Sequence, residues 1–149
     1  MASKDNGGAR TFWERGEAMF HQGSSTIQIA GQVCIAAFFL LIGLRNLKLA
    51  ENHVRKFAAL GVPFPRAFLW AGFAFQFAGG LSVGLDVQAA FGACLLIVFT
   101  ILANVLFHRW WQLEDPVARR IHMNYFFNNV GNIGGLLVLI ALRWPVLWC

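Results

Sequence analysis

Residues 121–142 read IHMNYFFNNVGNIGGLLVLIAL and contain no Asp, Glu, Lys or Arg over 22 positions. Three further stretches share this property: residues 26–44 and 67–85, with 19 positions each, and residues 87–107, with 21. An α-helix rises about 1.5 Å per residue, so each stretch can cross a hydrocarbon layer about 30 Å thick. The sequence therefore predicts four transmembrane helices, since helices in a soluble protein would need polar faces toward water.

The chain is expected to reverse direction at Asp86, the one charged residue between positions 67 and 107. A single helix of that length would overshoot the bilayer about twofold. The remaining charges lie in the tails and connections, which are too short to hold another domain. The expected fold class is therefore an all-α integral membrane protein, an antiparallel bundle of four transmembrane helices.

Residues 45–60 join the first two predicted spans and combine apolar and charged positions at helical spacing. Leu47, Ala50, Val54 and Phe57 fall on one side of a helical wheel, and most of the charges lie elsewhere. This pattern is typical of an amphipathic helix that lies at the membrane surface. Glycine and prolines at positions 61, 63 and 65 end it.

The segment before the first span is expected to be a separate N-terminal tail, residues 1–25, followed by a four-helix domain, residues 26–149. Residues 11–21 can form a short surface helix whose aromatic side chains Phe12, Trp13 and Phe20 dip into the interface. These three residues are the candidates for docking a partner protein.

The charge distribution suits a membrane better than nucleic acid. The 149 residues carry a net charge of +5, but their cations flank the apolar stretches and form no single patch. The first and third connections hold eight Lys or Arg residues, whereas the opposite side holds four. Because cytoplasmic loops are enriched in these residues, both termini are expected on the non-cytoplasmic side of a bacterial inner membrane.

Polar side chains inside the predicted spans need a reason, because lipid cannot hydrogen-bond to them. Asn124, Asn128, Asn132 and Gly135 recur at helical spacing along one face of the fourth span. Amides and small residues of this kind typically join neighbouring helices. The expected helix-packing residues are Gly80, Gly84, Gly131, Gly135 and Asn132.

A second interpretation is a small polar pocket that holds a ligand. Its candidate residues are Gln76, Asn104, His108 and Asn128, whose uncharged donors could bind the two carbonyl oxygens of a quinone headgroup. A metal or haem site is less favoured, because His53, His108 and His122 show no recognised ligand spacing. No catalytic constellation is recognisable, which favours a protein without activity of its own.

The layout from Gly43 to Leu137 resembles the DoxX family of small four-helix membrane proteins. The matching motifs are Gly43 with Lys48, the Gly61-x-Pro63-x-Pro65 turn, Gly79-Gly80-Leu81-x-x-Gly84, His108, and Gly134-Gly135-Leu136-Leu137. The family often carries a glutamate where this chain has Gln76, so a role in proton transfer is not expected there. The resemblance implies a four-helix bundle associated with membrane redox assemblies, one of which is a thiosulfate:quinone oxidoreductase.

Two functional hypotheses follow. The first is a non-catalytic accessory subunit of a larger redox or electron-transfer complex, in contact with lipids and with other membrane subunits. The second is a quinone-interacting subunit of an oxidoreductase, with quinone as its cofactor. A small-solute transporter is disfavoured, because four short spans show no paired broken helices.

Overall fold

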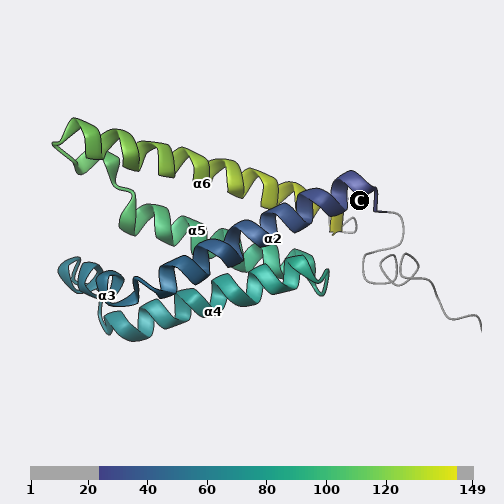
Figure 1. Cartoon of the computed structure of the whole chain (residues 1–149), viewed down its shortest axis with the longest axis horizontal. Helices are drawn as coiled ribbons and strands as arrows, with labels where there is room; N and C mark the ends of the chain where they lie inside the picture. Colours follow the sequence, from purple (N-terminus) through teal and green to yellow (C-terminus); the bar gives the residue numbers. More distant parts are fainter. Residues whose placement is uncertain (1–23, 144–149) are drawn as a thin grey trace, which may run out of the picture.

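The computed structural model describes residues 24–143, and every regular element in that range is a helix (Figure 1). The long helices are α2 (Thr26–Leu47), α4 (Pro65–Gly84), α5 (Ala89–Phe107) and α6 (Pro116–Arg143). Shorter elements are α3 (Ala50–Ala59) and the 3-10 turn η1 (Trp110–Gln112). The four long helices are long and apolar enough to cross a membrane, which confirms the predicted spans. Phe12, Trp13 and Phe20 lie outside the described residues.

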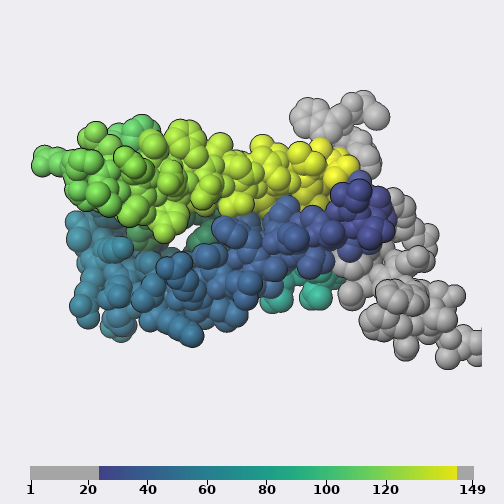
Figure 2. Space-filling model, turned by 45° about the horizontal axis from the view of Figure 1, so that its top comes forward, coloured from purple at the N-terminus to yellow at the C-terminus, as the bar shows by residue number. Residues whose placement is uncertain are grey.

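The helices pack in the order α2, α4, α5 and α6, each beside the next. α2 meets α6 over a short region near the C-terminal end of α6, and the two helices diverge toward α3 (Figure 1). The space-filling view shows the opening that this divergence leaves between α6 and α2 (Figure 2). One end of the bundle is therefore closed by all four long helices, whereas the other end is more open.

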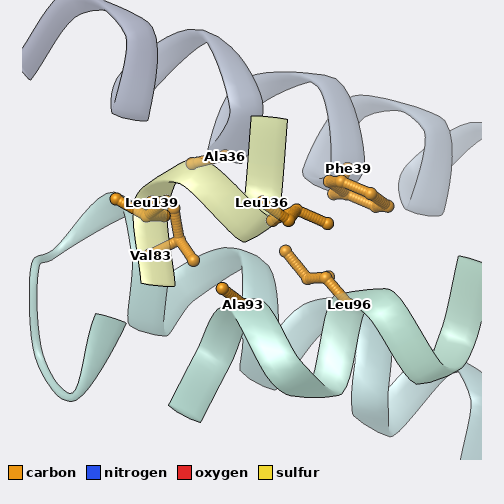
Figure 3. Close-up of a cluster of buried hydrophobic side chains, with 7 residues drawn as sticks. All are labelled: Ala36, Phe39, Val83, Ala93, Leu96, Leu136 and Leu139. Carbon is orange, nitrogen blue, oxygen red and sulfur yellow. The ribbon is translucent and has the colours of Figure 1, made fainter. Parts of the chain in front are cut away.

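The apolar core lies toward the closed end and draws on all four long helices (Figure 3). Its buried members are Ala36, Phe39, Val83, Ala93, Leu96, Leu136 and Leu139. Lipid is as apolar as these side chains, so their contribution comes from close van der Waals packing and not from removal of water. The bundle accordingly depends on how closely its backbones approach.

Glycines allow the closest approach, which is between α4 and α5. A Cβ added at Gly79 would lie 2.8 Å from the carbonyl oxygen of Gly92, and one at Gly92 would lie 2.5 Å from Oγ of Ser82. Gly80 and Gly84 lie against α2, where an added Cβ would meet Leu40 and Ala36 at 3.0 and 3.1 Å. Side chains at these positions would push the helices apart.

Gly131 was expected to pack against another helix in the same way, but the structure differs. A Cβ added there would meet nothing within 4 Å. Its motif partner Gly135 has one such neighbour, Cδ1 of Ile35, at 3.6 Å. The reason is that α6 turns a different face toward the bundle, with Leu136 and Leu139 buried in the core.

A buried ion pair joins the helices at the closed end. Nη2 of Arg143 lies 3.1 Å from Oδ1 of Asp86, and the two side chains are 9% and 1% exposed. Gln32 donates to the same carboxylate oxygen at 2.9 Å and to the carbonyl of Val83 at 2.7 Å. Arg143 also donates to Oε1 of Gln32 at 2.8 Å and to Oγ of Ser24 at 2.9 Å.

We call Ser24, Gln32, Asp86 and Arg143 the Arg143 cluster. It connects the start of α2, the turn between α4 and α5, and the last residue of α6. Asp86 occupies that turn with a φ of 54°, in the left-handed region that Asp tolerates better than most residues. The turn thus places its carboxylate where α2 and α6 converge.

The other end of the bundle is covered by α3. Phe57 is 4% exposed and packs with Leu69 and Phe73 of α4, so the apolar side of α3 faces the bundle. The amphipathic helix was expected over residues 45–60. Residues 45–47 instead continue α2, and α3 begins at Ala50. Among the described residues, every Lys and Arg except Arg143 lies toward this end: Arg45, Lys48, Arg55, Lys56, Arg66, Arg109, Arg119 and Arg120.

The close α4–α5 contact predicts opposite outcomes for two glycine substitutions. Gly92→Ala should destabilise the bundle by roughly 1–3 kcal/mol, because its methyl group must displace Ser82. Gly134→Ala, on a helix position with open space around it, should be neutral or stabilising by about 0.5–1 kcal/mol. Unfolding in detergent measures both, and equal effects would contradict the proposed contact.

Candidate functional site

The seam between α5 and α6 holds a pair of hydrogen-bonded amides. Nδ2 of Asn129 donates to Oδ1 of Asn104 at 2.7 Å, and Nδ2 of Asn104 donates to the carbonyl of Phe126 at 3.3 Å. Asn104 is 5% exposed and Asn129 is half-buried. Each amide therefore has a partner on the facing helix, which satisfies polar groups that lipid could not.

Two histidines continue this seam toward the α3 end. His108 follows Asn104 by one helical turn, and its Nδ1 lies 3.4 Å from Nδ1 of His122. A hydrogen bond between these two nitrogens requires one ring to donate and the other to accept, so at least one ring is neutral. The ring of Tyr125 lies 5.4 Å from that of His108 and 6.4 Å from that of His122, between ring centroids.

His53 of α3 lies near the same end, with its ring 5.6 Å from that of Phe107 between centroids. Both ring nitrogens are buried without a hydrogen-bond partner in the described structure. Burial lowers the pKa of His53, and the Lys56 cation lowers it further. The position therefore favours a neutral imidazole.

The three histidines come from three different elements, but they do not assemble a metal site. In residues 24–143, no group of three or more His, Cys, Asp or Glu side chains is placed to hold a metal ion. Their contacts are with aromatic rings and with one another.

Gln76 lies elsewhere, in the contact between α4 and α2. Its side chain is fully buried, and its Nε2 donates to the carbonyl of Phe39 at 2.9 Å. Its Oε1 is buried without a partner in the described structure. A Cβ added at Gly43 would lie 3.3 Å from Cδ of Gln76, so α2 passes close to this amide. Gln76 thus links two helices.

Asn128 was expected to line the same pocket, and the structure places it differently. Asn128 is exposed, as is Asn124, whereas Asn129 faces α5. Neighbouring residues on an α-helix point about 100° apart, so Asn128 faces outward when Asn129 faces α5. Asn132, expected to pack against another helix, is half-buried.

The four residues of the predicted pocket are therefore divided among three places. Asn104 and His108 lie one turn apart at the α5–α6 seam, Gln76 lies between α2 and α4, and Asn128 lies on the outer side of α6.

The Arg143 cluster was not predicted from the sequence, although a signal was present. Asp86 is the one acidic residue between two apolar spans, and Arg143 is the first cation after the last span. The topology places both at the same end of the bundle. Because ionisable residues within or beside membrane spans usually pair with one another, the shared end of the bundle could have indicated the Arg143–Asp86 pair.

Comparison with known proteins gives one match. The sequence pattern of the DoxX family matches residues 28–109, which is more than half of the chain and includes most of α2, together with α3, α4 and α5. No curated protein and no solved structure matches the chain significantly. The matched region contains Gln76, Asn104 and His108, whereas α6 with its amides lies outside it.

The α5–α6 seam predicts a difference between adjacent asparagines. Asn129→Leu should lower the stability of the bundle by about 0.6–1.7 kcal/mol, since it removes the donor to Asn104. Asn128→Leu should change the stability of the single chain much less, because Asn128 is exposed and its side chain makes no hydrogen bond to residues 24–143. Unfolding in detergent, with the protein dilute enough to be a single chain, tests this order. A larger loss of stability for Asn128→Leu would contradict the orientation of α6 described here.

Proposed function

Because the chain belongs to the DoxX family of membrane proteins, we propose that it is a non-catalytic accessory subunit of a larger membrane redox or electron-transfer complex. The observation that carries this proposal is that polar side chains within the spans hydrogen-bond to other helices of the bundle. Gln32, Gln76, Asn104 and Asn129 all donate to groups on other helices or their connecting turns. Side chains committed to assembling a bundle favour a structural role over a catalytic one.

The proposed location is a bacterial inner membrane, with the α3 end in the cytoplasm and both termini outside. Eight of the nine described cations lie toward the α3 end. The ninth, Arg143, is neutralised by Asp86 at 3.1 Å, so it contributes little net charge at the opposite end. Both features agree with the enrichment of Lys and Arg in cytoplasmic connections. α3 would then lie at the cytoplasmic surface of the membrane.

The proposed docking element is the N-terminal tail with Phe12, Trp13 and Phe20. Deleting residues 1–21 from the tagged chain should reduce the yield of partner subunits recovered from native membranes in mild detergent. The unfolding temperature of the isolated chain, measured alongside, separates lost docking from a destabilised bundle. Unchanged partner yield would contradict docking by the tail.

A second candidate is a quinone-interacting subunit, and the histidine pair favours it. When His108 and His122 share a hydrogen bond between their Nδ1 atoms and both rings are neutral, the accepting ring keeps an N–H at Nε2 that can donate to a quinone carbonyl. In this alternative, His108→Leu should weaken quinone binding by about 1–3 kcal/mol. Gln76→Leu provides a comparison at a fully buried amide in a different helix contact.

Turnover of the partner complex separates the two candidates. An accessory subunit predicts that His108→Leu and Gln76→Leu leave quinone-dependent turnover nearly unchanged at equal partner yield. Lost turnover with normal partner yield would contradict the accessory role and support the quinone-interacting subunit. The same membranes and the same tagged chain serve both measurements.

A further inference from the structure

The least covered of the four long helices is α6. In its most apolar window 11% of the residues are buried, compared with 22%, 33% and 28% for the other three helices. Its inner side packs on α5, and its C-terminal end meets α2. Much of the remaining surface of α6 is open along the side of the bundle (Figure 1).

Asn124, Asn128 and Gly131 are exposed on the open side of α6, and Gly135 continues their row to the contact with α2. Asn124, Asn128, Gly131 and Gly135 follow one another at intervals of four, three and four residues, and therefore share one face. We call these four residues the Asn–Gly stripe. Both asparagines are exposed and make no hydrogen bond within the described part of the chain.

The depth of the stripe makes this exposure costly. Asn128 lies only three to four residues, about 5 Å along the axis, from the centre of the uncharged run 121–142. At that depth lipid offers no hydrogen-bond partner to the amide. Gly131 is likewise unused, since a Cβ added there would meet nothing within 4 Å, whereas Gly135 borders α2, where an added Cβ would lie 3.6 Å from Cδ1 of Ile35. An open glycine beside unpaired amides is typical of a face where two transmembrane helices meet.

We propose that this face binds a second copy of the chain, with α6 packed against α6 near Asn128 and Gly131. The argument is self-complementarity. An asparagine amide both donates and accepts, so two identical amides can satisfy each other. A twofold axis along the membrane normal keeps both copies in the same orientation and brings each asparagine to the height of its counterpart.

Charge does not oppose this arrangement at the crossing point. The stripe lies within the uncharged run 121–142, and the open position at Gly131 lets the two backbones approach closely. Arg120 lies about 12 Å along the axis from Asn128, so helices that cross at an angle there separate the two guanidinium groups. The dimer does not depend on the accessory role proposed above, because it uses α6 and not the tail.

Cysteine cross-linking of the full chain in lipid vesicles tests the interface. In a background with Cys34, Cys94 and Cys149 replaced by alanine, single variants carry cysteine on the stripe: Asn124→Cys, Asn128→Cys and Gly131→Cys. The matched controls Val130→Cys and Leu137→Cys are also exposed, but they lie on another side of α6. Oxidation should give covalent dimers for the stripe variants and not for the controls.

Every other pattern contradicts the dimer. Equal cross-linking at all five positions would indicate random collision, cross-linking at the controls alone would place the interface elsewhere, and no cross-linking would indicate a single chain. Stripe cysteines that in native membranes link to another protein, without any dimer of this chain, would assign the face to a partner instead.

A second measurement uses the affinity of the two copies. Asn128→Leu should weaken dimer formation in vesicles about threefold to twentyfold, measured by energy transfer between labelled copies. Asn129→Leu acts on the α5–α6 seam and serves as the control for altered packing inside the chain. An unchanged affinity for Asn128→Leu would overturn the amide contact.

Discussion

The buried ion pair between Arg143 and Asp86 is the constraint on which the shape of this bundle depends. At the edge of a membrane, either charge alone would carry a large desolvation cost, and together they offset it. The pair and Gln32 hold α2, the α4–α5 turn and α6 at one end. α6 otherwise meets the bundle mainly through α5, so without this pair its position against α2 would depend on a few core side chains.

The positions of the four long helices could be predicted from the sequence, because length and the absence of charge decide whether a helix can span a membrane. The orientation of each helix about its axis could not. α6 is apolar on nearly every side, so its sequence contains no pattern that marks an inner face, and asparagines occur on both sides. Asn129 meets Asn104, whereas Asn128, one residue earlier, faces outward. The Arg143 cluster was missed because its members are far apart in sequence and pair only once the bundle forms.

The polar residues of the spans divide into two groups with different consequences. Those facing inward are hydrogen-bonded across helix contacts, and they explain why a small chain keeps amides inside a membrane. Those on the outer side of α6 make no such contact within residues 24–143, and we propose that they serve assembly. The DoxX match ends at Arg109 and includes Gln32, Gln76 and Asn104 of the inward group. The outward amides belong to α6, which the family pattern does not describe.

The most direct test of this account is a double-mutant cycle on the ion pair, with unfolding measured in lipid micelles. Arg143→Met removes the cation, and Asp86→Asn removes the charge while keeping a side chain that tolerates the φ of 54°. Each single variant should lose roughly 3–5 kcal/mol, because it removes one partner of a buried ion pair, and the double variant should lose far less than their sum. Additive losses would show that the two residues act independently, and would contradict the ion pair as the constraint on which the shape of the bundle depends.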